Sequence, residues 1–316
     1  MKKRCLFLVL LLTLLLTGCR RTEPQPEVVD PPAPPEVEQE EPPEALTELR
    51  IEITRDGLTT EQLTAAVREL PRALEEYLAE ETEIETVSVT VGASHAATAQ
   101  TLAAGNVDIA FLPAEALLRY GEGAQAVLGE LDVNSNLSVM VAGRETLLCA
   151  APTEYGTQLA NRASSGKPLS WAEVSNACWG VLEETSVYGY GSLDLWLAEN
   201  YDGLRVRDLP AVSEYADWDS LLNAAAAGEV DAFVIPEGQQ GGFAVLDAAE
   251  RLHETVAAAA PRAELTDREF VFSLHRALER LAQERHDLSP LLGAERFAPM
   301  EDSQLDAMRR LINLGE

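Results

Sequence analysis

The stretch Val91-Gly-Ala-Ser-His-Ala-Ala-Thr-Ala-Gln-Thr-Leu-Ala-Ala-Gly-Asn-Val-Asp-Ile-Ala-Phe-Leu-Pro113 contains the order of elements that decides the fold. It continues a strand pattern at residues 87–91, and Ser94 then stands where a helix N-cap is expected. Gly105 ends this helix, and residues 107–112 form a second apolar strand. A strand, a helix and a strand in this order predict parallel strands joined by a crossover helix.

The same pattern recurs along most of the chain. A strand at 49–53 precedes a helix from Thr59 or Thr60 to about Glu80, with Pro71 as a local disturbance. The further elements that we expect are a helix at 115–120, a strand at 177–182, a helix at 188–200, a short strand at Leu204–Leu209, a helix at 218–227, a strand at 230–235 and helices at 267–285 and 303–314. Two such α/β halves predict a two-lobe fold. We expect each lobe to be a mainly parallel sheet flanked by helices, with a ligand cleft between the lobes.

The N-terminus has the pattern of an export signal. Three basic residues, Lys2, Lys3 and Arg4, precede an apolar run at 5–16 that is short for a bilayer span. The run ends in Leu-Thr-Gly-Cys19, which resembles the bacterial lipobox, where the cysteine is acylated and becomes the new N-terminus. An uncleaved anchor with an incidental cysteine is the alternative. Either reading places the rest of the chain at the extracytoplasmic face of a membrane.

A proline-rich segment separates this signal from the folded body. Residues 20–47 hold eight prolines and eight acids with almost no aliphatic pattern, which predicts an extended, disordered stalk. At about 3.1 Å per residue the stalk would reach roughly 80 Å. The predicted organisation is a signal peptide at 1–18, the stalk at 19–47, the first part of lobe I at 48–140, lobe II at 141–236 and a return to lobe I at 237–316.

The composition argues against several classes of protein. The chain has 316 residues and a formal net charge of −29, from 53 acids and 24 bases, so it would repel nucleic acids. Four histidines without a Cys/His ligand spacing give no reason to expect a metal or a cofactor. Neither a Gly-x-Ser-x-Gly nor a His-Glu-x-x-His motif occurs, so we expect no catalytic residues and no enzyme.

Two cysteines remain after the signal is accounted for. Cys5 is lost with the signal peptide and Cys19 carries the lipid, which leaves Cys149 and Cys178. In an oxidising compartment these two can pair, or they can be separate buried thiols. A disulfide is the arrangement that we expect.

Three motifs after the stalk carry a family resemblance. The first is the stretch that ends at Pro113, and the second is Trp218 to Val234, which ends Ala-Gly-Glu-Val-Asp-Ala-Phe-Val. Between them, Glu184-Thr-Ser-Val-Tyr-Gly-Tyr190 is similar to a Ser-Thr-Ser-Gly-Tyr turn at a helix start. Together with the tail from Leu288, they make residues 48–316 resemble the phosphate/phosphite/phosphonate-type substrate-binding proteins of ABC transporters, which have the type 2 periplasmic-binding fold.

The resemblance implies a solute-binding lipoprotein of an ABC importer. Its expected partners are a small anionic or zwitterionic solute and a membrane permease, and we expect a monomer. A second class stays open, a sensory or partner-binding lipoprotein with a degenerate pocket. Neighbouring genes for a permease and an ATPase would separate the two classes.

The second-lobe turn is a candidate anion cradle. A helix N-terminus has unpaired N–H groups and a partial positive charge, so nearby hydroxyls can complete a binding site. The candidates are Thr185, Ser186 and the Tyr188 hydroxyl, and the alternative is a plain N-cap. Val187 lacks the hydroxyl that the family places there, and Tyr188 would fill space for a tetrahedral anion. These departures keep the degenerate-pocket hypothesis open.

The other candidate ligand contacts are Ser94, His95 and Asp219. His95 stands where the family often has an aromatic contact, and it could donate to an anion or stack on a ring. Asp219 matches a family carboxylate that contacts ligand amines, or it is a solvated helix acid. The two repeated acids Asp108 and Asp231 are predicted to be structural, because carboxylates there can accept hydrogen bonds from neighbouring loop amides.

Overall fold

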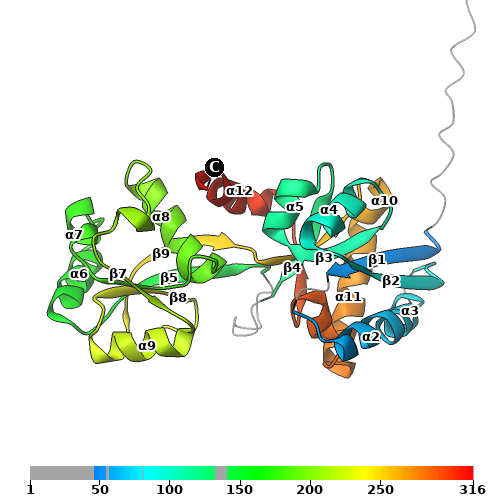
Figure 1. Cartoon of the computed structure of the whole chain (residues 1–316), viewed down its shortest axis with the longest axis horizontal. Coiled ribbons are helices and arrows are strands. Elements are labelled where there is room, and N and C mark those ends of the chain that lie inside the picture. The colour runs from blue at the N-terminus through cyan, green and yellow to red at the C-terminus, as the bar shows by residue number, and fades with distance from the viewer. Residues whose placement is uncertain (1–45, 55–56, 81, 132–140, 316) are drawn as a thin grey trace, which may run out of the picture. The chain divides into compact units, whose positions relative to one another are not determined.

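A computed structural model describes residues 46–54, 57–80, 82–131 and 141–315. The predicted signal peptide, Cys19 and nearly all of the predicted stalk lie outside these residues. The rest forms two α/β lobes, each built around its own sheet (Figure 1). This arrangement confirms the predicted fold class.

The first lobe contains a six-stranded sheet with the strand order β11-β4-β10-β3-β1-β2. Its elements are β1 (Glu48–Thr54), α2 (Thr60–Arg68), α3 (Leu70–Leu78), β2 (Thr86–Gly92), α4 (His95–Ala103), β3 (Ile109–Pro113), α5 (Ala114–Tyr120), β4 (Gln125–Glu130), β10 (Thr255–Ala259), α10 (Ala263–Thr266), α11 (Arg268–Glu284), the 3₁₀ turns Ser289–Leu292 and Asp302–Leu305, β11 (Phe297–Pro299) and α12 (Asp306–Leu314). Helices α2, α3 and α11 lie on one side of the sheet, and α4, α5 and α10 on the other (Figure 1).

The second lobe contains a five-stranded sheet with the order β7-β6-β8-β5-β9. Its elements are β5 (Arg144–Ala150), α6 (Glu154–Ser164), α7 (Trp171–Ser175), β6 (Trp179–Leu182), the π-helical turn η1 (Val187–Gly191), α8 (Ser192–Asn200), a 3₁₀ turn (Val206–Asp208), β7 (Val212–Tyr215), α9 (Trp218–Ala227), β8 (Ala232–Pro236) and β9 (Ala244–Leu252). Two apolar cores lie on its opposite faces. One joins the sheet to α6, α7 and α8, and the other joins it to α9.

Local capping chemistry sets the helix starts near the positions predicted. Thr59 accepts a hydrogen bond from the Gln62 N–H, and the Gln62 side chain accepts one from the Thr59 N–H. Ser94 caps α4 by accepting from the Ala97 N–H at 3.2 Å. The helix predicted from 59 to 80 is divided into α2 and α3, and Pro71 lies in the first turn of α3, where its missing N–H leaves no bond unmade.

The sheets are mixed, which corrects the prediction that they are mainly parallel. Strands β2, β1 and β3 run parallel, as do β7, β6 and β8. Strand β10 is antiparallel to β3 and β4, and β5 is antiparallel to β8 and β9. The chain leaves the first lobe through β4 and β5 and returns through β9 and β10. The outgoing and returning strands lie in the same sheets, so they must run in opposite directions.

Two predicted boundaries are wrong. Strand β9 pairs with β5 through Leu252, so the chain returns to the first lobe after Leu252 and not at residue 237. The strand predicted at Leu204–Leu209 is not a strand. Residues Val206–Asp208 form a 3₁₀ turn, and the strand beside β6 is Val212–Tyr215. In both places the mixed polarity of the segment gives no period that would identify its partner strand.

The two repeated acids are structural, as predicted. The Asp108 carboxylate accepts from the backbone N–H of Arg50 at 2.8 Å and from the guanidinium groups of Arg50 and Arg262. The Asp231 carboxylate accepts from the Thr153 hydroxyl at 2.6 Å and from the backbone N–H of Cys178 at 3.0 Å. In each lobe the acid therefore joins the start of a central strand to the neighbouring parallel strand.

The expected disulfide is not formed. Cys149 and Cys178 are free thiols, the first buried and the second half-buried. Cys149 lies on β5 and Cys178 directly precedes β6, and β8 lies between these strands. Strands two positions apart are separated by about 9–10 Å, which is beyond the roughly 7 Å Cα separation that a disulfide can bridge.

Helix α12 contacts both lobes. Met308 and Leu311 pack on the apolar core of the first lobe. Arg310 pairs with Glu199 of α8 at 2.8 Å and also with Glu250 of β9. The last helix of the chain therefore lies against both lobes and contributes to the contact between them.

The C-terminus of α9 offers a test of local structure. Gly228 has φ = 74°, and a Cβ built there would meet Thr153 Cγ2 at an ordinary 3.5 Å. Gly228→Ala should therefore lower the free energy of unfolding by about 1–2 kcal/mol through backbone conformation alone. Chemical denaturation measures this. Gly242→Ala, at a site with no heavy atom within 4 Å, is the control and should change stability by less than about 0.5 kcal/mol. Equal losses in both variants would contradict the explanation.

Candidate functional site

The first candidate position is the start of α4. Ser94 follows β2 closely and is exposed, and its side-chain oxygen accepts from the Ala97 N–H. His95 is the first residue of the helix and is half-buried. The hydroxyl of a capping serine accepts from the helix and keeps its own proton, which it can donate to another group. This helix start therefore has donors suited to an anion.

The second candidate position is the turn that follows β6, which we call the Ser186 turn (residues 185–191). Ser186 accepts from the Gly189 N–H at 3.0 Å, and its carbonyl accepts from the N–H groups of Tyr190 and Gly191. Thr185 is exposed beside it. Gly189 has no room for a side chain, because a Cβ there would lie 2.5 Å from Leu182 atoms. The sequence therefore folds here into a tight π-helical start with hydroxyls at its N-terminus.

Asp219 lies in the first turn of α9 and is exposed. The N-cap of this helix is Asp217, which accepts from the Ser220 N–H at 2.7 Å, and this bond lowers the pKa of the Asp217 carboxyl. Asp219 therefore does not cap the helix, and its carboxylate stays exposed to solvent. Glu115 in α5 pairs with Arg119 at 2.9 Å, the ordinary role of an acid in a first helical turn.

Tyr188 is not available as a ligand contact in this structure, which corrects its predicted role. Its side chain is only 5% exposed, and its hydroxyl donates to the carboxylate of Glu130 at the end of β4. The hydroxyl also accepts from the backbone N–H of Glu254 at 3.1 Å. The guanidinium of Arg144 lies 4.9 Å from the centre of the Tyr188 ring. The ring therefore fills a buried position between the lobes, and its polar atom is already bound.

Glu130 is a buried acid that sequence reasoning missed. Its carboxylate accepts from the N–H groups of Glu254 at 2.7 Å and Thr255 at 3.1 Å, in addition to Tyr188. Burial raises the pKa of Glu130 to about 7, although these hydrogen bonds act in the opposite direction. The sequence signal was a lone acid within the apolar segment Val127-Leu-Gly-Glu-Leu131. Acids are seldom buried without a specific partner.

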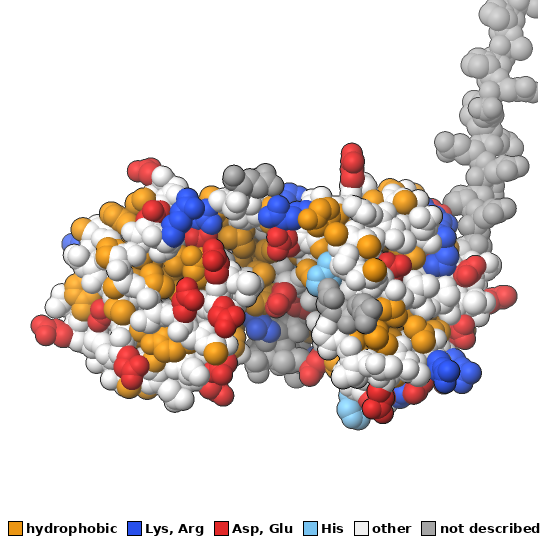
Figure 2. Space-filling model, in the orientation of Figure 1, with side chains coloured by type: hydrophobic (Ala, Val, Ile, Leu, Met, Phe, Trp, Pro, Cys, Tyr) orange, Lys and Arg blue, Asp and Glu red, His pale blue; other side chains and the backbone are white. Residues whose placement is uncertain are grey.

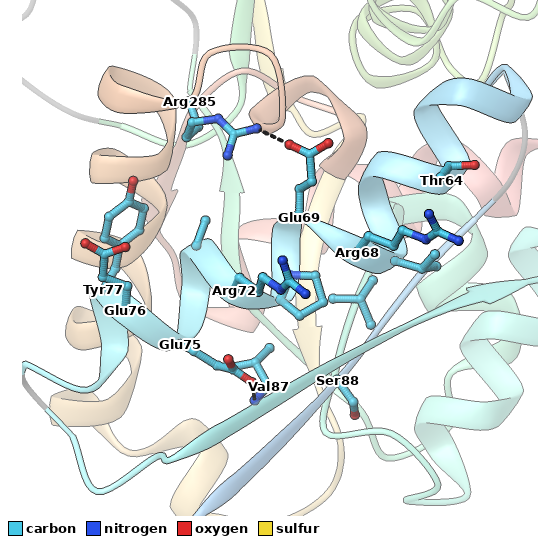
Figure 3. Close-up of a pocket in the computed structure, with 14 residues that line it drawn as sticks. Thr64, Arg68, Glu69, Arg72, Glu75, Glu76, Tyr77, Val87, Ser88 and Arg285 are labelled. Atoms are coloured by element: carbon cyan, nitrogen blue, oxygen red, sulfur yellow. Dashed lines mark hydrogen bonds and ion pairs between the residues drawn. The ribbon is translucent and has the colours of Figure 1, made fainter.

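A surface cavity of about 1240 Å³ lies elsewhere, beside α3 and β2 in the first lobe, and is lined by none of the predicted site residues (Figure 3). Some of its charged groups are bound to other groups that line it. Arg285 pairs with Glu69 at 2.7 Å, and Glu75 accepts from the Val87 N–H at 3.0 Å. We interpret this cavity as the groove where α3 packs beside the edge strand β2, and we place the functional site at the two helix starts.

The surface of the described chain is strongly acidic. Asp and Glu side chains lie over both lobes on the face shown in Figure 2. Within residues 46–54, 57–80, 82–131 and 141–315, three or more His, Cys, Asp or Glu side chains never gather closely enough to hold a metal ion. In the same part of the chain, every helix is too short or too polar to cross a bilayer.

Comparison with known proteins identifies relatives of this fold. The model of a family described as "ABC transporter, phosphonate, periplasmic substrate-binding protein" matches residues 57–305. No curated protein matches the sequence. Among solved structures, Mh-p37 of Mycoplasma hyorhinis is 8% identical with a TM-score of 0.52, over 86% of this chain and 99% of that one. Transferrin 1 from Manduca sexta is 10% identical with a TM-score of 0.54, over 84% of this chain and 46% of that one.

A third structure is PhnD1 from Prochlorococcus marinus in complex with methylphosphonate. It is 11% identical with a TM-score of 0.41, over 84% of this chain and 97% of that one. At such identities the likeness of Mh-p37 and transferrin 1 supports the fold alone. Evidence about function comes from the family match, which covers most of the described chain.

Proposed function

Because the chain belongs to the family of periplasmic substrate-binding proteins of ABC phosphonate transporters, we propose that it is a lipid-anchored capture protein for a small anionic solute. Proteins of this family bind a solute outside the cytoplasm and deliver it to a membrane permease. The match over residues 57–305 is the observation that carries this assignment. The solute, the residues that bind it and the lipid anchor are our proposals.

The proposed site uses one helix start from each lobe. In the first lobe Ser94 and His95 would donate to the solute, and in the second lobe Thr185 and Ser186 would do so together with the N–H groups of η1. Asp219 is assigned to a positively charged group on the solute, because its carboxylate is exposed and does not cap the helix. A solute that contacts both lobes would favour the closed arrangement over the open one.

A panel of methylphosphonate, other phosphonates, phosphite and small amino compounds tests this proposal in thermal-shift assays. A ligand present at 100 times its Kd should stabilise the folded protein by about 2.7 kcal/mol. A phosphonate or phosphite that raises the Tm would support the proposed solute class. Failure of the whole panel would favour the second candidate, a partner-binding lipoprotein with a degenerate pocket. The hydrogen bond from the Tyr188 hydroxyl to Glu130 favours that candidate, because the hydroxyl can then no longer donate to a solute at the turn.

The lipid anchor is tested by Cys19→Ser. Diacylation would add a large apolar area at about 0.8 kcal/mol per buried CH₂, so loss of the thiol should move the protein from the membrane fraction to the soluble fraction. Mass spectrometry of the N-terminal peptide should show the lipid in the parent protein alone. Cys149→Ser is the control and should leave the protein with the membrane. Membrane retention of Cys19→Ser would instead identify the apolar run at 5–16 as an uncleaved anchor.

A further inference from the structure

The contact between Tyr188 and Glu130 joins the Ser186 turn to the two connections between the lobes. We call these the outgoing passage, from β4 to β5, and the returning passage, from β9 to β10. Glu130 is the last residue of β4, directly before the outgoing passage to β5. On the returning passage, Glu254 lies between β9 and β10, and Thr255 is the first residue of β10. Tyr188 belongs to η1 in the second lobe, and its hydroxyl reaches both passages through Glu130 and the Glu254 N–H. The Tyr188 side chain of the Ser186 turn is therefore bonded to residues at both passages.

The contact is buried and has several bonds. Glu130 is 8% exposed and Tyr188 is 5% exposed. The Glu130 carboxylate accepts from three donors, which are the Tyr188 hydroxyl and the N–H groups of Glu254 and Thr255. Val187, the neighbour of Tyr188, also packs on the first-lobe core. A buried group with this many partners has few alternative positions, so the backbone of the turn is held in place.

The charged and titratable groups around the contact come from several elements. Arg144 of β5 lies over the Tyr188 ring, and the Glu254 carboxylate acts on Tyr188 through its charge. His253 is 1% exposed, and burial with the nearby Arg251 lowers its pKa to about 4, so it is neutral near pH 7. The ionisable group of the contact that changes charge near neutral pH is therefore Glu130.

We propose that Glu130 is a positioning residue for solute capture, and that it acts through Tyr188 to fasten the Ser186 turn to the two passages between the lobes. This inference rests on the proposed function of the turn. A movement of the passages would be transmitted to the hydroxyls and N–H groups at the start of η1. Tyr188 thus supports the binding turn from behind, where its place at a helix start had led us to predict a direct ligand contact.

The sign of a pH effect follows from the buried carboxyl. When the turn is released, Glu130 becomes solvated and its pKa falls from about 7 toward 4.5. The fastened state therefore binds the proton more tightly. Fastening is strongest at low pH and weakens as pH rises through about 7. The opening equilibrium of the turn should increase several-fold between pH 5.5 and pH 7.5, within the limit of about tenfold per pH unit set by one proton.

Amide hydrogen exchange on the mature protein without solute is the first test. Tyr188→Phe should lower the protection of peptides that cover residues 185–191 by about tenfold or more, and leave peptides from β1 and β2 unchanged. Tyr190→Phe is the matched control, because it removes a hydroxyl from the same turn, and no hydrogen bond of that hydroxyl is found among the described residues. Its protection should stay within twofold of the parent. Equal protection in Tyr188→Phe and the parent would overturn the proposal.

Glu130→Gln gives the pH readout that a purely structural role would not produce. After correction for intrinsic exchange, the opening of the turn should depend on pH in the parent and be nearly independent of pH in the variant. The same pH dependence in both proteins would overturn the role of Glu130.

Titration with methylphosphonate by calorimetry is the second test. Binding to Tyr188→Phe should be about tenfold weaker than binding to Tyr190→Phe. Equal affinities despite a loosened turn would overturn the link to capture. A loosened turn in a protein that binds no phosphonate would support the fastening and count against the proposed solute class alone.

Discussion

Asp108→Ala is expected to lower the free energy of unfolding by about 3 kcal/mol. The Asp108 carboxylate is 1% exposed and binds two guanidinium groups, with Arg50 Nη2 at 2.7 Å and Arg262 Nη1 at 2.8 Å. Breaking a buried ion pair costs about 3–5 kcal/mol. We expect a loss at the lower end of this range because the Arg50 and Arg262 side chains are 37% and 36% exposed. Water can therefore solvate the two guanidinium groups once the carboxylate is gone.

Chemical denaturation monitored by circular dichroism measures this loss. Asp108→Asn keeps the shape of the side chain and some of its acceptors, so it should cost less than the alanine variant. Asp231→Ala in the second lobe is the matched control. Among the described residues that carboxylate accepts from a hydroxyl and a backbone N–H, and its loss should cost about 1–2 kcal/mol. Equal losses at the two positions would show that the guanidinium groups add nothing to the role of Asp108.

Ser186→Asp is expected to weaken binding of an anionic solute by about 100-fold or more. Aspartate is as good an N-cap as serine, so the bond to the Gly189 N–H and the local fold should persist. The substitution places a negative charge in the proposed cradle. Like charges about 4 Å apart repel by roughly 4 kcal/mol at an effective dielectric of 20, and 2.7 kcal/mol already corresponds to 100-fold in Kd.

Calorimetric titration with a phosphonate that binds the parent protein measures this effect. Thr59→Asp is the control, because it makes the same charge change at the N-cap of α2, which has no assigned role in binding. It should change affinity less than twofold. Unchanged binding to Ser186→Asp, with binding to the parent intact, would place the solute site elsewhere.

Much of the fold followed from residues close together in the sequence. Ser94, Thr59 and Asp217 cap helices through bonds to residues three positions ahead, and Gly228 ends α9 in the left-handed conformation. Such contacts are local, so composition and spacing predict them. The boundary after Leu252 and the mixed sheets were missed, because they depend on which distant strands become neighbours.

In the candidate site, too, the sequence predicted the local features and missed the one that depends on a distant residue. The hydroxyls of Ser94 and Ser186 stand at helix starts, as the sequence indicated, and their contact with a solute stays a prediction. The role of Tyr188 was not predictable, because its partner Glu130 lies 58 positions away. Nothing in the turn itself shows that its tyrosine is directed toward the passages between the lobes.

The sequence by itself determined the two-lobe α/β class and the capped helix starts, because each rests on short-range patterns that only a few backbone conformations satisfy. The tertiary structure alone decided that Cys149 and Cys178 stay apart, that β9 belongs to the second sheet and that Tyr188 is bound to Glu130. Those outcomes depend on burial and on contacts between residues far apart in the chain. Burial and long-range contacts exist only once both sheets have formed and packed.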